Sequence, residues 1–160
     1  MTLMQWTPAM SVGLEPLDQD HRRLIDIINR LAENAGSGED KEEQVRQCLY
    51  ALMRYAETHF AREETVMKAC DFPGLGHHLE EHGDFVGRIQ RLTERFDQAP
   101  EKQSDVVNDE LLQFLKDWLR HHILIEDMAY RPLAEHNAEA IEAAKTFKPT
   151  EVWWGGRASA

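Results

Sequence analysis

Residues 75–96 read LGHHLEEHGDFVGRIQRLTERF, and this stretch decides the fold. Its large apolar side chains, together with two histidines, recur at alternating steps of three and four residues, which is the spacing of one face of an α-helix. The residues on this face are Leu75, His78, His82, Phe85, Ile89, Leu92 and Phe96. Pro73 and Gly74 precede the stretch and Pro100 follows it, and both residue types interrupt helices. The pattern predicts an amphipathic helix with histidines on its buried face.

Two more amphipathic helices are expected before this one. The first covers about residues 18–35 and ends before the glycine-containing segment 36–38. The second runs from Asp40 to about Cys70. Glu43 lies three residues after Asp40, and this pair resembles a capping arrangement at the start of the helix.

One further helix is expected after residue 100. Its predicted buried face includes Leu111, Leu115, Trp118, His122 and Ile125. Ser104 or Asp105 is the expected cap. Pro132 should end this helix or begin a short successor, and residues 133–145 are expected to form one more helix.

Four amphipathic helices with short connections predict an all-α, antiparallel up-down-up-down four-helix bundle, because short loops make consecutive helices neighbours. A chain of 160 residues is long enough for one core of this kind. We expect residues 1–145 to form the domain, with an irregular lead over 1–17, and residues 146–160 to form an irregular tail. The tryptophans at 153 and 154 are expected to pack against the bundle, since two free indoles would expose much apolar area.

Composition argues against several classes of function. The chain has 18 Lys and Arg against 29 Asp and Glu, and its formal charge of −11 would repel nucleic acids and anionic membrane surfaces. It shows neither a signal-like start nor a long apolar run, which predicts a cytoplasmic protein without membrane insertion. Cys48 and Cys70 fall about 33 Å apart on one predicted helix, too far for a disulfide, and are expected to be reduced.

Potential metal ligands occur where the predicted helices can bring them together. They are His21, His59, Glu63, His78, His82, His122 and Asp127. A lone histidine on an apolar face is usually a hydrogen-bonded core residue, but several buried imidazoles and carboxylates without partners would destabilise the fold. His59 and Glu63, like His78 and His82, are four residues apart, so each pair projects from one side of its helix. A shared centre with these donor types indicates iron.

The partner of His122 has two candidates. Plain α-helical spacing favours Glu126 at i+4, whereas Asp127 at i+5 is rotated by about 140°. A π-type bulge would bring Asp127 nearly into line, and such bulges are frequent at functional sites. His77 and His121 directly precede ligand candidates, point about 100° away from them towards solvent or a neighbouring helix, and are not expected to be metal ligands.

Four short segments together carry a recognisable pattern. They are Leu17–His21 (LDQDH), His59–Glu64 (HFAREE), His78–His82 (HLEEH) and Trp118–Asp127 (WLRHHILIED). In order, in separation and in the unusual His-x-x-x-x-Asp spacing, they resemble the hemerythrin family, specifically its bacterial single-domain members. The resemblance covers about residues 4–131, and the combination is far more specific than any single segment.

The resemblance implies a non-haem di-iron centre in which Asp127, not Glu126, is a ligand. One iron would take three histidines: His78, His82 and His122. The other would take two: His21 and His59. The bridges would be Glu63, Asp127 and a solvent-derived oxo or hydroxo group. Counting ligands leaves one position open on the second iron, where O₂ would bind.

The implied function is reversible O₂ binding, for storage or for delivery to an oxygen-requiring enzyme, rather than catalysis. Two alternatives remain on the same resemblance. One is a sensing module that responds to O₂ or nitric oxide. The other is a di-iron redox enzyme, such as a nitric oxide reductase or a peroxidase.

Overall fold

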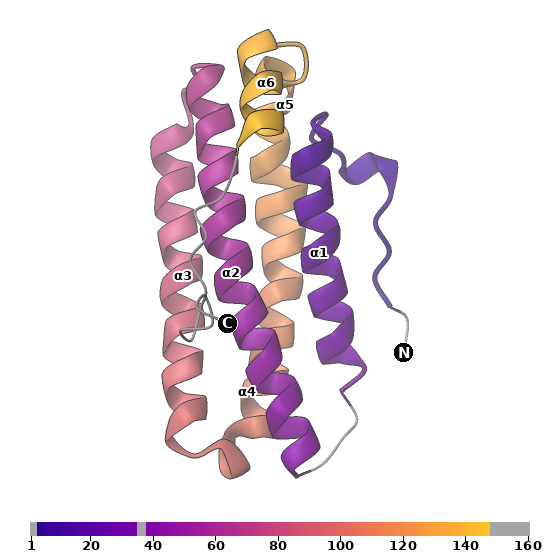
Figure 1. Ribbon diagram of the computed structural model, residues 1–160, viewed down its shortest axis with the longest axis vertical. Helices are drawn as coiled ribbons and strands as arrows, with labels where there is room; N and C mark the ends of the chain where they lie inside the picture. The colour runs from indigo at the N-terminus through magenta and orange to yellow at the C-terminus, as the bar shows by residue number, and fades with distance from the viewer. Residues whose placement is uncertain (1–2, 35–37, 148–160) are drawn as a thin grey trace.

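The computed structural model describes residues 3–34 and 38–147, and every regular element within these ranges is a helix. Four long helices form the body: α1 (Glu15–Ala32), α2 (Glu39–Ala69), α3 (Leu75–Gln98) and α4 (Pro100–Trp118). Consecutive helices run antiparallel, and α1 and α3 each contact both α2 and α4, which closes the bundle (Figure 1). The predicted all-α four-helix bundle is confirmed.

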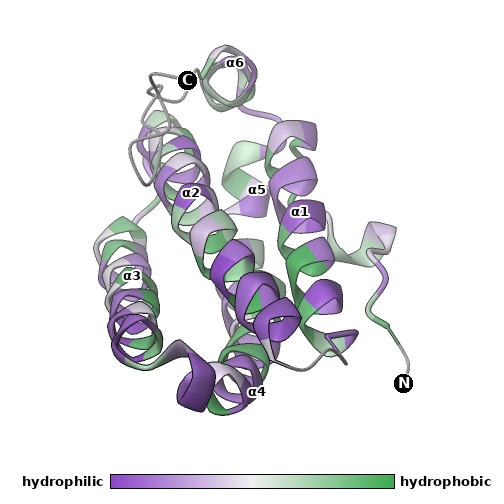
Figure 2. Ribbon diagram, turned by 60° about the horizontal axis from the view of Figure 1, so that its bottom comes forward, coloured by the Kyte–Doolittle hydropathy of each residue, from purple (hydrophilic) through white to green (hydrophobic). Residues whose placement is uncertain are grey.

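The core consists of two apolar clusters separated by a polar layer. The helices turn their hydrophobic faces inward and their polar faces outward (Figure 2). On α1, His21 lies between Leu17, which belongs to the smaller cluster, and Leu24, which belongs to the larger one. On α2 and α3 the predicted ligands likewise lie between residues of the two clusters, so the predicted ligands share one level of the bundle.

Helix α1 begins three residues earlier than the sequence pattern predicts. Pro16 lies in its first turn, where a missing amide proton costs nothing because the first amides of a helix have no partner within it. Asp18, the expected first residue, is instead buried and accepts hydrogen bonds from the Val12 amide (2.9 Å) and the Ser11 hydroxyl (2.5 Å). These bonds attach the N-terminal lead to α1.

The predicted cap of α2 is wrong. The residue at the cap position is Gly38, with φ of +60°, and Asp40 lies inside the first turn without capping it. Acidic residues in that turn still favour the helix, because they face the positive end of its dipole.

The predicted cap of α4 is also wrong. The helix begins at Pro100, and the Ser104 hydroxyl, one turn later, donates back to the Pro100 carbonyl. Asp105 instead pairs with Lys41 of α2 at 2.6 Å. The fixed backbone angle of proline suits the first turn of a helix, so Pro100 is the first residue of α4.

The chain beyond α4 is broken into short helices. A π-helical segment covers Leu119–Glu126 and a 3-10 turn covers Asp127–Ala129. Pro132 lies in the first turn of α5 (Arg131–Ala134). This confirms the second of its two predicted roles, which was to begin a short helix after α4. Helix α6 (Ala138–Thr146) then packs on α1 and α2 at one end of the bundle (Figure 1). The predicted tail lies outside the described residues from position 148 onward, including both tryptophans.

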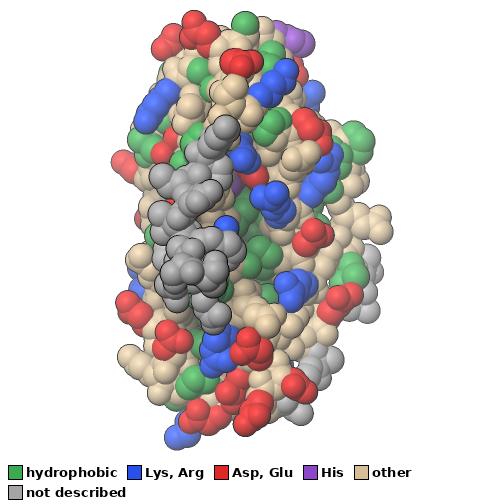
Figure 3. All heavy atoms as spheres, viewed as in Figure 1, with side chains coloured by type: hydrophobic (Ala, Val, Ile, Leu, Met, Phe, Trp, Pro, Cys, Tyr) green, Lys and Arg blue, Asp and Glu red, His purple; other side chains and the backbone are tan. Residues whose placement is uncertain are grey.

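The surface is strongly polar. Acidic and basic side chains are interspersed on the face shown in Figure 3, with acidic groups gathered toward its lower end. No helix among the described residues is long and apolar enough to cross a membrane.

Candidate metal centre

The structure places all the predicted ligand side chains in the polar layer. Each is at most 3% exposed: His21, His59, Glu63, His78, His82, His122 and Asp127. They come from α1, α2, α3, the π-helical segment and the first residue of the 3-10 turn. Side chains more than 100 residues apart in sequence therefore meet in the interior of the bundle.

The donor atoms fall into two groups. Within each group, one donor atom per residue lies within 4.8 Å of the others. The larger group is Glu63, His78, His82 and His122. The smaller group is His21, His59 and Asp127. The larger group therefore contains three imidazoles and the smaller group contains two.

The Glu63 carboxylate lies between the two groups. Its Oε2 is 3.2 Å from Nε2 of His59 and 3.4 Å from Nε2 of His82, and its Oε1 is 3.7 Å from Nε2 of His78. One carboxylate thus reaches imidazoles of both groups, which is the geometry needed to bridge two ions.

The Asp127 carboxylate spans the groups in the same way. Its Oδ1 lies 2.8 Å from Nε2 of His78 and 3.0 Å from Nε2 of His122, while its Oδ2 lies 3.3 Å from Nε2 of His21. The layer therefore contains a second candidate bridge.

The π-helical segment explains why Asp127 and not Glu126 points inward. The Asp127 amide donates to the His122 carbonyl, an i→i+5 bond that stacks these two residues on one side of the helix. Glu126 instead lies near the exposed His77 and His121. The wider turn rotates the i+4 residue out of the layer.

Several buried donor atoms have no hydrogen-bond partner in the described part of the chain. They include both oxygens of Glu63, Oδ2 of Asp127, and Nε2 of His21, His82 and His122. An unpaired buried polar atom destabilises a fold by about 1–3 kcal/mol, and more when it is charged. Metal ions placed in the two donor groups would satisfy these atoms together, whereas other atoms without a partner, such as the Tyr50 hydroxyl and the Trp6 indole nitrogen, lie outside the groups.

Three carboxylates outside the ligand set hold histidine rings by their other nitrogen. Asp20 binds Nδ1 of His59 (2.9 Å) and Glu64 binds Nδ1 of His82 (3.0 Å). Glu81 binds Nδ1 of His122. Asp20 and Glu64 come from the helix that precedes their histidine along the chain, whereas Glu81 is on α3 and His122 lies beyond α4.

This arrangement prepares the rings for metal binding. A proton held on Nδ1 by a carboxylate leaves the Nε2 lone pair facing the centre and makes the ring a stronger ligand. Sequence reasoning missed Asp20, Glu64 and Glu81. Each adjoins a predicted ligand in sequence but contacts a histidine on another helix, so only the packing reveals its partner.

Asp20 is itself held by a cation. Arg62 pairs with its Oδ2 and also donates to the Pro16 carbonyl. Burial raises the pKa of Asp20, but the hydrogen bonds and charges of His59 and Arg62 outweigh burial and leave that pKa below its ordinary value. Asp20 therefore stays ionised as the acceptor for His59.

The same contacts set the charge of the layer before any ion enters. Burial alone would lower the pKa of His59. The neighbouring carboxylates of Asp20 and Glu63 outweigh burial and raise that pKa to about 10. The pKa of His78 also rises to about 10, because Asp127 and Glu63 outweigh the effect of burial. Burial opposes ionisation of Glu63, yet the nearby histidines hold its pKa well below the ordinary value. In the absence of metal, protons on histidines balance the buried carboxylates.

Aromatic rings pack against the outward sides of the histidines. Phe60 stacks on His82 with ring centres 3.8 Å apart, and Trp118 stacks on His122 at 4.0 Å. Tyr55 stacks on His59 at 4.9 Å. These contacts restrict rotation of the rings and keep water away from them.

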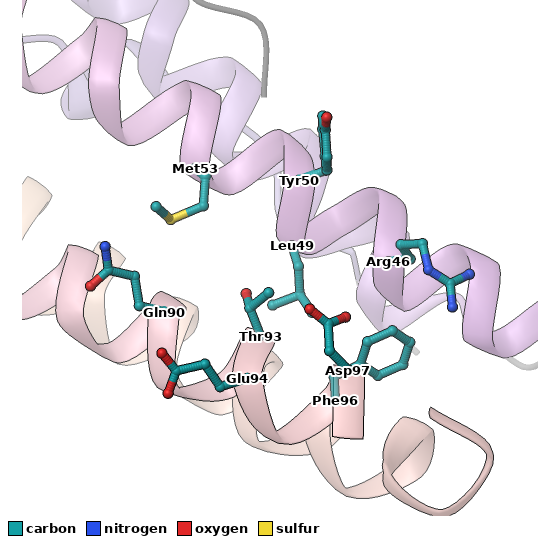
Figure 4. Close-up of a pocket in the computed structure, with 9 residues that line it drawn as sticks. All are labelled: Arg46, Leu49, Tyr50, Met53, Gln90, Thr93, Glu94, Phe96 and Asp97. Carbon is teal, nitrogen blue, oxygen red and sulfur yellow. The ribbon is translucent and has the colours of Figure 1, made fainter. Parts of the chain in front are cut away.

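A separate groove of about 570 Å³ lies between α2 and α3, lined by Leu49, Met53 and Phe96 with Glu94 and Asp97 at its edge (Figure 4). Leu49 precedes His59 by ten residues, about 15 Å along the helix. The groove is therefore separate from the donor layer.

Comparison with known proteins supports the assignment of the layer to a metal centre. Residues 12–134 match the family model described as the hemerythrin HHE cation binding domain. A bacteriohemerythrin of Methylococcus capsulatus is 34% identical over 135 residues, covering 82% of this chain and 97% of that protein. A myohemerythrin of Riftia pachyptila is 30% identical over 126 residues, covering 79% and 89%.

A solved structure is similar over nearly its whole length. A crystal structure of a hemerythrin mutant superposes with a TM-score of 0.67 at 28% sequence identity, covering 84% of this chain and 99% of the other. The helical bundle and the sequence therefore point to the same set of relatives.

Proposed function

The chain belongs to the hemerythrin family, and on that premise we propose that it binds O₂ reversibly at two iron ions held in the polar layer. The observation that carries the proposal is the convergence of seven buried donor side chains, several of whose atoms have no hydrogen-bond partner among the described residues. Five imidazoles and two carboxylates form a donor set suited to iron.

The proposed ligand sets follow the two groups of donor atoms. One iron would be held by three imidazoles: His78, His82 and His122. The other would be held by two: His21 and His59. The bridging carboxylates would be Glu63 and Asp127, whose oxygens reach both groups. If a solvent-derived oxo or hydroxo group also bridged the ions, the set with three imidazoles would be complete and the set with two, His21 and His59, would leave a position for O₂.

The protein's own contribution is to hold neutral imidazoles, to supply negative charge and to exclude water. When bound, the two ferrous ions supply the electrons that O₂ takes up on binding. Asp20, Glu64 and Glu81 fix the rings with Nε2 facing inward, and the aromatic rings behind them keep the layer dry. Tyr130, fully buried beside His78, stays neutral, because burial and the carboxylates of Glu63 and Asp127 raise its pKa well above the ordinary value.

Carriage is favoured over oxygenation by the count of carboxylates. Ferritin-like di-iron sites use four carboxylates, and hard oxygen donors support high oxidation states of iron. The layer described here offers two candidate bridging carboxylates among five imidazoles. We propose storage of O₂, or its delivery to an oxygen-requiring enzyme, in the cytoplasm. The two buried free cysteines, Cys48 and Cys70, fit a reducing compartment.

Oxygen uptake by the reduced, iron-loaded protein tests the proposal. We expect two irons per chain, uptake of one O₂ per pair, and no release of hydrogen peroxide into solution. Fast irreversible oxidation with peroxide release, or turnover of nitric oxide, would contradict it and indicate a redox enzyme.

A matched pair of variants tests the ligand set. His78→Ala should lower the iron content well below two per chain, because it removes a buried donor. His136→Ala should not, because that ring is exposed and lies outside the layer. Equal iron content in the two variants would contradict the assignment.

A further inference from the structure

A second set of histidines and carboxylates lies directly outside the buried layer. Each member precedes a buried donor by one residue: His77, Glu81, His121 and Glu126 precede His78, His82, His122 and Asp127. The α-helical spacing that aligns His78 with His82 also aligns His77 with Glu81. The π-helical spacing that aligns His122 with Asp127 also aligns His121 with Glu126. The outer set is thus built by the same two segments as part of the inner one.

We propose that this outer set is a second metal site, specific for a divalent transition-metal ion of the zinc type. It uses ligands other than those of the proposed di-iron centre, although Glu81 also accepts a hydrogen bond from Nδ1 of His122 and so joins the two. Its four ligands would be His77, Glu81, His121 and Glu126.

Donor atoms of His77, Glu81 and Glu126 lie within 4.8 Å of one another, and His121 adds a fourth donor farther from Glu81. Nε2 of His77 lies 3.0 Å from Oε1 of Glu81 and 3.7 Å from Oε2 of Glu126. Nε2 of His121 lies 4.0 Å from Oε1 of Glu81 and 3.5 Å from Oε1 of Glu126. In a tetrahedral zinc site with bonds of about 2.0–2.1 Å, neighbouring donors are about 3.3 Å apart. Small rotations of the exposed rings would close the remaining difference.

Exposure and support fit a site that takes its ion from solution. The imidazoles of His77 and His121 are 60% and 65% exposed, whereas the carboxylates of Glu81 and Glu126 are 17% and 24% exposed. Glu81 is fixed in place because its other oxygen accepts a hydrogen bond from Nδ1 of His122. The site therefore has one anchored carboxylate, that of Glu81, and two accessible imidazoles.

The donor chemistry selects the class of ion. Two imidazoles with two carboxylates suit Zn²⁺, Co²⁺ or Cu²⁺, while Mg²⁺ and Ca²⁺ prefer all-oxygen sites. With both imidazoles neutral, the two carboxylates give the site a charge of −2 before an ion binds. This charge balances that of a divalent cation. The alternative is a network of ion pairs that holds protons in place of a metal.

Zinc titration of the iron-loaded full-length protein at pH 7.5 tests the proposal. We expect calorimetry and metal analysis to find one Zn²⁺ per chain beyond the iron. The double variant His77→Ala/His121→Ala should bind that ion at least tenfold more weakly, and Glu126→Gln should weaken it too. His136→Ala is the matched control and should bind as the unaltered protein does.

Equal zinc binding by the double variant and the control would overturn the proposal, as would absence of the extra ion from the unaltered protein. Iron content is measured in the same samples, so failure of the outer site is distinguished from failure of the di-iron assignment. If the protein takes up no iron, the zinc count should still differ by one between the control and the double variant.

Discussion

Glu64 shows how a residue outside the ligand set can control metal affinity. Its carboxylate accepts the Nδ1 proton of His82 at 3.0 Å and is a quarter exposed, so its role is electrostatic more than structural. Asp20 and Glu81 hold His59 and His122 in the same way. A negative acceptor makes each imidazole a stronger donor to a metal.

We therefore predict that Glu64→Gln weakens metal binding by about 10- to 100-fold while the fold is retained. An amide still accepts a hydrogen bond but supplies no charge. Competition with a chelator measures the effect, and Glu80→Gln, an exposed neighbour of the same chemistry, is the control. Equal affinities in the two variants would show that the carboxylate has no role.

The pKa values of the layer predict how the metal-free protein responds to pH. His59 and His78 have pKa values of about 10 in the fold against 6.5 as free side chains, so their protonation stabilises the fold fully below pH 6.5. That stabilisation is lost as the pH rises toward 10. The pKa of Glu63 is lowered, so its contribution is present above pH 4.5 and is lost on acidification.

The metal-free protein should consequently be most stable between about pH 4.5 and 6.5. Thermal unfolding followed by circular dichroism should show a melting temperature that falls from pH 6.5 to pH 10. The iron-loaded protein should lack this fall, because metal replaces the protons. A metal-free melting temperature that rises over that range would contradict the proton assignment.

At the scale of elements, helical periodicity was enough to predict the four long helices but not all of their ends. The caps expected at Asp40 and at Ser104 or Asp105 were wrong, because Gly38 and the Ala99–Pro100 step begin those helices without a side-chain cap. Asp18 was expected to begin α1 and instead anchors the N-terminal lead. Local sequence shows which residues can cap, while tertiary contacts decide which of them do.

The π-helical segment marks the limit of prediction for the site. All seven donors could be named from sequence and resemblance, but residue spacing alone left Glu126 and Asp127 as alternatives. The i→i+5 bond from the Asp127 amide to the His122 carbonyl resolves which of the two faces inward. The carboxylates that hold the histidine rings, Asp20, Glu64 and Glu81, could not be named, because each contacts a histidine on another helical segment.

The register of this segment makes a direct prediction. Deletion of the exposed Ile125 should convert the turn to an α-helix with the aspartate at i+4 from His122, so metal binding should be retained. Insertion of one alanine after Ile125 should rotate the aspartate out of the layer and lower the iron content. Measuring the iron content of both variants shows whether iron binding depends on aligning the aspartate with His122 or is lost whenever the segment is disturbed. Loss of iron in both would contradict the register argument.

At the scale of the whole molecule, the donor layer separates two apolar clusters and joins five helical segments. Without metal, these buried groups rely on shared protons. A ligand that binds only the folded state stabilises it in proportion to the logarithm of its concentration over Kd. The layer should therefore make the stability of the bundle depend on metal.

Removal of iron by a chelator at pH 8 should lower the melting temperature by several degrees or more and increase hydrogen exchange in the helix segments near the layer. The α2–α3 end that lines the Leu49–Phe96 groove should be less affected. Uniform destabilisation with no local change in exchange would contradict the placement of the metal.

Repeated oxygenation followed by visible absorption tests reversible O₂ binding at the proposed di-iron centre most directly. The protein is reduced without air, exposed to O₂, and then purged with nitrogen through several cycles. We predict a visible band that appears with O₂, disappears on purging and returns with little loss of amplitude. A band that fails to appear, or a permanently oxidised spectrum after the first exposure, would contradict the claim.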